Sequence, residues 1–185
     1  MYACAVVGGV GWAGYAGCVE LEVGDRVVYG NHGVGRVAAR KRLEVLGEKQ
    51  EVIVVELGDE LTVTLPIRRA QSQLRPLADG ADLEQVGEAL REDVQLSTGN
   101  WLSRRNETLK KLSEGSPVAL AEIVSEGAQR ERVRQAQGSK PQLSVGEREV
   151  FGKARSLLSG EIALALDVEQ DAAESWIDEH LSRPA

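Results

Sequence analysis

The sequence predicts an α+β fold, in which a small β-barrel over residues 21–77 precedes a compact all-helical domain over residues 81–185. The first part holds short runs rich in Val, Ile, Leu and Thr, separated by turn residues, which is typical of strands. The second part places apolar residues at helical spacing behind residues that often begin helices. A hydrophobic fraction of 42% over 185 residues supplies enough apolar side chains for packed cores, which excludes an intrinsically disordered protein.

Four runs in the first part have the composition of strands: "DRVVY", "GRVAARKRLEV", "EVIVVEL" and "LTVTLPI". Turn signals separate them at 30–35, 46–49 and 58–60. Both faces of "EVIVVEL" are apolar, because Val52 and Val54 alternate with odd-numbered apolar residues, and such a strand fits the centre of a small barrel. Prolines suit strand ends, where we expect Pro66 and Pro76. Four or five such strands predict a Tudor- or SH3-like barrel.

The second part begins with two expected helices. The first covers 81–92, "ADLEQVGEALRE". The second lies in "GNWLSRRNETLKKL", where Asn100 is a suitable N-cap and leucines recur at roughly helical spacing. This helix has an unusual start, because Trp101 stands at its tip with Arg104 and Arg105 close behind. Tryptophan occurs only three times in the chain, so its position at a basic helix tip needs an explanation.

Three further helices complete the predicted domain. The third begins at the N-cap Ser116, with Pro117 at the first helical position, and a polar loop at 135–142 follows it. The fourth begins with a capping box formed by Ser144 and Glu147. The fifth is "DVEQDAAESWIDEHL", and its expected core contacts are Ala172, Trp176 and Leu181.

Residues 1–20 form an N-terminal extension that we expect to be poorly ordered. The stretch is apolar but lacks the basic residues that open a signal peptide, and it is too short and glycine-rich for a spanning helix. Cys4 and Cys18 both lie in it, so no disulfide framework or zinc site is predicted, and the cysteine-free remainder fits a reducing cytosol. An exported protein is the alternative that this tail raises, and N-terminal sequencing of the native protein would decide it.

The charges are unevenly distributed along the chain. The net charge of −7 argues against indiscriminate nucleic-acid binding. Basic residues nevertheless dominate the tip at 101–112 and the segment 128–155, whereas acidic residues dominate from 159 onward. We therefore expect a helical domain with one basic and one acidic face.

Catalytic chemistry is not predicted. His32 and His180 are far apart in sequence and have no partners at metal-ligand or acid–base spacing. The close glycines of "GNHGVG" lack both the phosphate-binding pattern and a following helix. We expect no enzyme, no cofactor and no metal site.

Several motifs in order resemble the bacterial CarD/CdnL family of transcription regulators. They are "LEVGDRVVYGNHGVGRV", "LTVTLP", "NWLSRRNETLKKL" and "LSVGEREVFGKARSLLSGEIALAL". The likeness runs from Leu21 to the end of the chain, and its first part also resembles the polymerase-interacting module of the transcription-repair coupling factor. The family fold that this implies, a Tudor-like module followed by a helical domain, agrees with the division predicted from the strand and helix signals.

The resemblance also implies partners and a role. The β module would dock on the β subunit of RNA polymerase by adding a strand to its edge, and the helical domain would contact promoter DNA in the minor groove at the upstream edge of the melted bubble. Trp101 would be the wedge there, with arginines behind it to hold phosphates. Such a regulator would stabilise the open complex in the cytoplasm, with no membrane and no small-molecule substrate.

Site residues follow from the resemblance by position. The DNA-contacting set comprises Trp101, Arg104, Arg105, Asn106, Arg148 and Lys153. Asn106 stands where some relatives have lysine or arginine, and Arg148 stands where a relative has a DNA-facing lysine. The polymerase-contacting set comprises Arg40, Arg42, Leu43 and Thr64, and Thr64 stands where a relative has arginine.

Two interpretations stay open at this point. The leading one is a polymerase-bound regulator that also contacts promoter DNA. The alternative is a protein–protein adaptor on RNA polymerase without a functional DNA wedge, in which Arg104 and Arg105 form an ordinary solvated face. In either case, Arg40, Lys41 and Arg42 can also protect a sheet edge from self-pairing.

Overall fold

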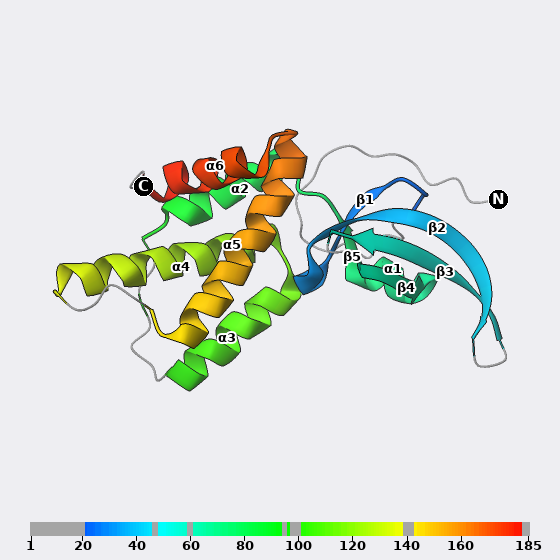
Figure 1. The fold of residues 1–185 in the computed structure, drawn as a ribbon, viewed down its shortest axis with the longest axis horizontal. Coiled ribbons are helices and arrows are strands. Elements are labelled where there is room, and N and C mark those ends of the chain that lie inside the picture. Colours follow the sequence, from blue (N-terminus) through cyan, green and yellow to red (C-terminus); the bar gives the residue numbers. More distant parts are fainter. Residues whose placement is uncertain are drawn as a thin grey trace.

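A computed structural model describes residues 21–45, 48–58, 61–93, 96, 101–138 and 143–182. The predicted N-terminal extension, and the export hypothesis that rests on it, lie outside these ranges. Figure 1 shows a curved sheet at one end of the molecule and a group of helices at the other, so the predicted α+β fold is confirmed. We call β1 to β5 with α1 the sheet part, and α2 to α6 the helical part.

Within the described ranges, five strands form one antiparallel sheet in the order β4-β3-β2-β1-β5. The elements of the sheet part are β1 (Arg26–Tyr29), the 3-10 turn η1 (Gly30–His32), β2 (Val34–Val45), β3 (Glu48–Leu57), β4 (Leu61–Pro66), α1 (Ile67–Gln73) and β5 (Leu74–Pro76). The register shifts between Val37 and Ala39, where β2 carries a bulge. Bulges bend strands, and β2 and β3 arch together around α1 in Figure 1.

The core of the sheet part lies on the concave side of these strands. Ile53 and Val55 of β3 are fully buried there, together with Ala70 of α1. The opposite face of β3 is also apolar, since Val52 is 1% exposed and Val54 is half-buried. The prediction of a central strand that is apolar on both faces is therefore confirmed, and β4 and β5 both end at the expected prolines.

Within the described ranges, five helices make the helical part: α2 (Gly80–Arg91), α3 (Trp101–Glu114), α4 (Pro117–Ala136), α5 (Val145–Leu166) and α6 (Gln170–Ser182). None of the described helices is both long enough and apolar enough to cross a bilayer. Helix α4 continues through Ala136, so the first residues of the loop expected at 135–142 are helical.

Side chains from every helix meet in the helical core. Ile123 of α4, Leu158 and Ile162 of α5, and Ile177 of α6 are at most 1% exposed. The expected core contact Ala172 is wrong: it is exposed, whereas Ala173 is fully buried. The physical reason is helical phase, because Ala173 and Ile177 are four residues apart on the face that meets the core. Trp176 and Leu181 pack against this core as predicted.

The structure confirms one predicted helix cap, shows no capping bond at a second, and adds a third that was not predicted. The capping box of Ser144 and Glu147 at the start of α5 is confirmed. Ser116 occupies the N-cap position of α4, but its side chain makes no capping hydrogen bond to the described residues. Asp79, which the sequence reasoning passed over, caps α2 by accepting from the backbone N–H groups of Ala81 and Asp82.

Candidate nucleic-acid interface and docking edges

Helix α3 carries the predicted wedge at its first residue. Trp101 begins the helix, but its side chain and the expected N-cap Asn100 lie outside the described part of the structure. Thr108 and Leu112, four residues apart, are buried and fix which face of α3 meets the core. The predicted contacts Arg105 and Asn106 are exposed, so both are available to a partner.

Arg104 has a different environment from its neighbour Arg105. Its side chain is 17% exposed, and its Nη2 lies 3.5 Å from Oε1 of Glu147 on α5. Glu147 is itself only 2% exposed. The same carboxylate lies 3.4 Å from Nη2 of Arg134 on α4 and accepts from the backbone N–H of Ser144 at 2.9 Å. One buried carboxylate therefore connects the first turn of α3 to the last turns of α4 and the start of α5.

Opposing effects act on the pKa of Glu147. Burial raises the pKa, because it penalises the charged carboxylate. Hydrogen bonds from Ser144 and the positive charges of Arg134 and Arg104 together outweigh burial and leave the pKa below its usual value. Glu147 is thus a stable anion at neutral pH, and its charge is compensated on both sides.

The two predicted DNA contacts on α5 lie at different places on the surface. Arg148 and Lys153 are both exposed. Lys153 lines a hollow of about 320 Å³ against η1 and the ends of β3 and β4, together with His32 and Leu61. Arg148 lines a separate hollow between α4 and α5, so the structure does not bring these two cations together.

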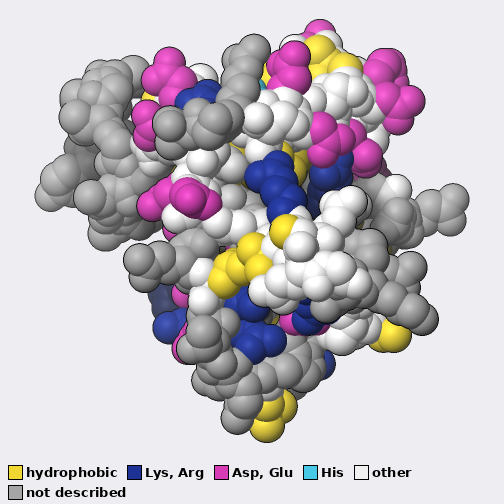
Figure 2. Space-filling model, turned by 90° about the vertical axis from the view of Figure 1, so that its left-hand side faces the viewer, with side chains coloured by type: hydrophobic (Ala, Val, Ile, Leu, Met, Phe, Trp, Pro, Cys, Tyr) yellow, Lys and Arg dark blue, Asp and Glu magenta, His cyan; other side chains and the backbone are white. Residues whose placement is uncertain are grey.

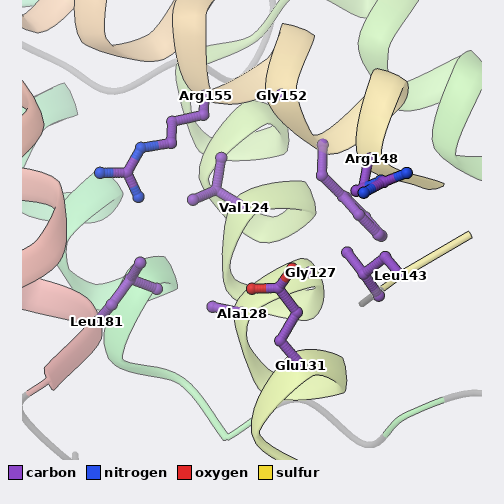
Figure 3. Close-up of a pocket in the computed structure, with 10 residues that line it drawn as sticks. Val124, Gly127, Ala128, Glu131, Leu143, Arg148, Gly152, Arg155 and Leu181 are labelled. Carbon is purple, nitrogen blue, oxygen red and sulfur yellow. The ribbon is translucent and has the colours of Figure 1, made fainter. Parts of the chain in front are cut away.

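Figure 3 shows the hollow that Arg148 borders, which has a volume of about 240 Å³. Its apolar wall includes Phe151, whose ring packs where a side chain at Gly127 would collide. The guanidinium groups of Arg148 and Arg155 point to opposite sides rather than converging, and Arg155 pairs with Asp178 at 2.8 Å. This arrangement does not provide the converging polar groups that a small-molecule site needs.

Strand alternation divides the four predicted polymerase contacts between two faces of the sheet. Arg40 and Arg42 lie opposite Ile53 and Glu51 on one face. Leu43 and Thr64 lie on the other face, since Leu43 pairs with Gln50 and Thr64 with Val54, at alternate positions of β3. All four are exposed, but the sheet does not gather them into one patch.

Arg40 is engaged within the sheet. Its guanidinium forms an ion pair with Glu51 across β2 and β3. The hydrogen bond from Arg40 is the main reason that the pKa of Glu51 is lowered. The same-face contact confirms the register, and it leaves Arg42 as the more accessible cation at this edge.

Three stretches of strand edge have no neighbour among the described residues. Strand β4, which carries Thr64, is one end of the sheet order, and β5 is the other. Strand β1 pairs with β2 only as far as Arg36, so the outer half of β2 has β3 on one side and no described strand on the other. Unpaired edges of this kind accept an added strand through main-chain hydrogen bonds.

A buried ion pair joins the sheet part to the helical part, and sequence reasoning missed it. Arg75 of β5 makes a two-pronged contact with Glu161 of α5, whose side chain is 1% exposed, and donates two hydrogen bonds to the carbonyl of Gly115. Glu161 also accepts from the backbone N–H of Ala78 at 3.1 Å. The available signal was an acidic residue at a core position of the apolar run "LLSGEIALAL".

The same junction holds the C-terminal end of α3. Gly115 follows α3 with a φ of +64°, and a Cβ on it would lie 2.8 Å from the Cα of Gly30 in η1. Only glycine permits this backbone approach without a shift. Helix α3 is therefore held at its end by the sheet part and near its start by Glu147.

Acidic and basic side chains are unevenly distributed over the face of the molecule that Figure 2 shows. Figure 2 shows most of the visible Asp and Glu side chains in the upper part of the view, with Lys and Arg side chains between and below them. The acidic residues of α6 include Asp171, Glu174, Asp178 and Glu179. A polyanion would therefore approach from the α3 side rather than from α6.

The histidines have ordinary structural neighbours. His32 stacks on Tyr29, and His180 stacks on Trp176 while its Nδ1 lies 2.8 Å from the Trp176 carbonyl oxygen. Among the described residues, no group of three or more potential ligands could hold a metal ion.

Comparison with known proteins matches both parts of the chain. Residues 21–78 match the family described as "CarD-like/TRCF RID domain", and residues 85–178 match "CarD, C-terminal domain". The chain is also 23% identical over 158 residues to the protein named "Putative transcription factor YdeB" from Bacillus subtilis (strain 168), covering 84% of this chain and 99% of that protein. The chain therefore belongs to the CarD/CdnL family of transcription regulators.

Proposed function

We propose that this protein docks on the β subunit of RNA polymerase and stabilises the promoter open complex by contacting DNA at the upstream edge of the bubble. Membership of the CarD family supports the coarser role, a non-enzymatic transcription factor associated with RNA polymerase. The observation that carries the finer role is α3, which begins at Trp101 and presents Arg105 and Asn106 on its exposed side.

Docking would use the sheet part. An extended strand of the polymerase can pair with an unpaired edge, and main-chain hydrogen bonds then supply the affinity. The edge strand β4, with Thr64 exposed, and the outer half of β2, with Arg42 and Leu43, are the candidate edges. Because Arg42 and Leu43 lie on opposite faces, one docked lobe would contact Arg42 or the Leu43 and Thr64 face, but not both equally.

The mechanism is differential binding, and it needs no bond to be made or broken. A factor that binds the open bubble better than the closed duplex shifts the equilibrium toward the open complex. The indole of Trp101 would pack against partly unstacked bases in the minor groove, and Arg105 would contact a phosphate. The acidic face over α6 would keep the rest of the molecule away from DNA. Docking on polymerase also places the site of action in the cytoplasm.

The adaptor function is the second candidate, and one observation favours it. Arg104 is committed to Glu147, so the tip of α3 offers fewer cations to phosphates than the sequence predicts. In an adaptor, both parts of the chain would bind proteins, and loss of the Trp101 side chain would leave DNA opening unchanged.

Open-complex lifetime with purified polymerase distinguishes the two functions. Stacking of an aromatic side chain on a base contributes about 1–3 kcal/mol. We expect Trp101→Ala to shorten the lifetime by roughly five- to a hundredfold, since about 1.4 kcal/mol is tenfold in a rate. Trp101→Phe should keep part of the effect.

Two controls accompany this experiment. Polymerase affinity should be unchanged in Trp101→Ala, because docking uses the sheet part. The melting temperature of the free protein should also hardly change if the indole is a wedge rather than a core residue. A folded, polymerase-binding alanine variant with the wild-type open-complex lifetime would rule out the wedge and leave the adaptor.

A further inference from the structure

We infer that Arg104 acts on the promoter through α3 and not through a phosphate: with Glu147 and Arg134 it forms a clamp that holds the tip of α3 and so positions Trp101. The inference rests on the proposed function, because it assigns Arg104 a role in aiming the wedge. It differs from the expectation that Arg104 contacts DNA directly.

The clamp is centred on a carboxylate that is almost inaccessible to solvent. Glu147 is 2% exposed, and it holds Arg104 at 3.5 Å and Arg134 at 3.4 Å. It also caps its own helix, because it accepts from the backbone N–H and the hydroxyl of Ser144 at 2.9 and 2.7 Å. One anion on α5 therefore contacts side chains of both α3 and α4, in addition to the hydrophobic core that these helices share.

Removing Arg104 from this clamp to reach a phosphate would be unfavourable. Glu147 would keep Arg134 as its cationic partner among the described residues, together with the hydrogen bonds from Ser144, and removing one cation from a buried anion is destabilising. Arg105 carries no such cost, because it is exposed on the neighbouring position of the same helix. The structure thus separates the two arginines by role: Arg105 faces a partner, and Arg104 faces the protein.

The start of α3 has features that make an additional hold useful. The first backbone N–H groups of a helix lack intrahelical partners, and helix ends fray. No acidic residue lies in the first turn of α3 to complement the helix dipole. Arg104 is three residues from Trp101, so it lies within the same first turn of the helix. Fixing Arg104 would therefore hold the backbone of the turn that carries Trp101.

Glu147→Gln tests the clamp, because the clamp and the change in net charge predict opposite effects on the stability of the open complex. Glutamine can still accept from Ser144 and keep the capping box, but it has no charge to hold the arginines. The variant is also one unit less negative, so charge alone would strengthen binding to DNA. The clamp predicts the opposite: a several-fold shorter open-complex lifetime at unchanged polymerase affinity, and faster hydrogen exchange in residues 101–108 of the free protein.

Arg104→Met and Arg105→Met form the matched pair. A phosphate contact contributes about one unit to the slope of log affinity against log salt. We expect Arg105→Met to lower the salt dependence of open-complex stability by about one unit and Arg104→Met to leave it unchanged. Glu147→Gln also serves if Arg104→Met fails to fold.

Combination with Trp101→Ala completes the test. If the clamp acts only through Trp101, neither Arg104→Met nor Glu147→Gln should shorten the lifetime further in a Trp101→Ala background. Additive effects, or a salt slope lowered by Arg104→Met, would overturn the clamp while leaving the proposed function standing. Trp101→Ala without any effect of its own would overturn both.

Discussion

At the scale of single residues, Gly115 shows how one position can connect two parts of a protein. Its φ of +64° is unfavourable for any residue with a Cβ, and its α-carbon lies against Gly30 of η1. Its carbonyl also accepts two hydrogen bonds from Arg75. Backbone conformation, close approach and hydrogen bonding therefore all depend on this residue.

Gly115→Ala should destabilise the protein more than Gly138→Ala does. Gly138 has a similar φ of +67°, but a Cβ there would meet nothing within 4 Å, so it reports the conformational cost alone. That cost is about 1–2 kcal/mol. At Gly115 the added methyl group must also displace backbone, which adds about 1–3 kcal/mol. Urea denaturation of the two variants measures the difference, and equal losses of stability would show that the Gly30 contact is easily relaxed.

At the scale of secondary-structure elements, the helix starts differ in how they are stabilised. Asp79 accepts two backbone hydrogen bonds at the start of α2, and Asp82 completes a capping box. Ser116 has the right position and residue type at the start of α4, but its hydroxyl makes no capping bond among the described residues, and Pro117 follows it. Residue type alone therefore does not tell which cap is stabilising.

Asp79→Ala and Ser116→Ala should separate these two cases. Loss of a functioning N-cap costs about 1 kcal/mol, so Asp79→Ala should lower the free energy of unfolding by about that amount. Ser116→Ala should change it by less than about 0.5 kcal/mol. Thermal or chemical denaturation gives both values. The assignment of caps is wrong if the serine variant loses as much stability as the aspartate variant.

Elements with local signals were predictable from the sequence, and elements that depend on distant partners were not. The strands β2 and β3 and the box at Ser144 follow from alternation and cap chemistry. Helix α1 was missed because its one buried residue, Ala70, is held by strands rather than by an amphipathic pattern. The three-residue strand β5 exists through its pairing with β1. The error at Ala172 was one of helical phase, because the core-facing pair is Ala173 and Ile177, one position further along α6.

At the scale of the whole molecule, the Arg75–Glu161 pair fixes the sheet part to the helical part. Both side chains are largely buried, at 13% and 1% exposure, and they are supported by main-chain bonds to Gly115 and Ala78. Arg26 adds a hydrogen bond to the carbonyl of Leu164 at 3.4 Å. The two parts are thus joined by specific polar contacts and not only by the chain between them.

Arg75→Met should cost about 3–5 kcal/mol, because it leaves Glu161 buried without its cation. The double replacement Arg75→Met with Glu161→Leu should recover part of that loss, since it removes the uncompensated anion as well. Arg155→Met is the control: its partner Asp178 is 61% exposed, and a surface pair contributes about 0–1 kcal/mol. Denaturation curves test this, and a double variant less stable than Arg75→Met would contradict the assignment.

At the candidate site, the features that lie close together in sequence were predictable, and the contacts between residues distant in sequence were not. Trp101 and Arg105 belong to one local motif, so the sequence alone proposes them as candidates. The engagement of Arg104 by Glu147 could not be predicted, because the two residues are 43 positions apart and meet only through the packing of α3 on α5. The split of Arg42 and Leu43 between two sheet faces was predictable from alternation, but the bulge in β2 shifts which residues oppose them on β3.

The two attachments of α3 have a mechanical consequence. Fourteen residues make α3 about 21 Å long, and Gly115 anchors the end opposite to Trp101. A tilt of roughly 5° about that anchor would move the tip by about 2 Å, a large part of the 3.4 Å rise between stacked base pairs. A small rotation of the helix about its contact with the sheet part therefore becomes a larger displacement at its first residue. In the proposed function, a change of a few degrees at the Gly115 contact would displace the start of the helix by about half a base step relative to the DNA.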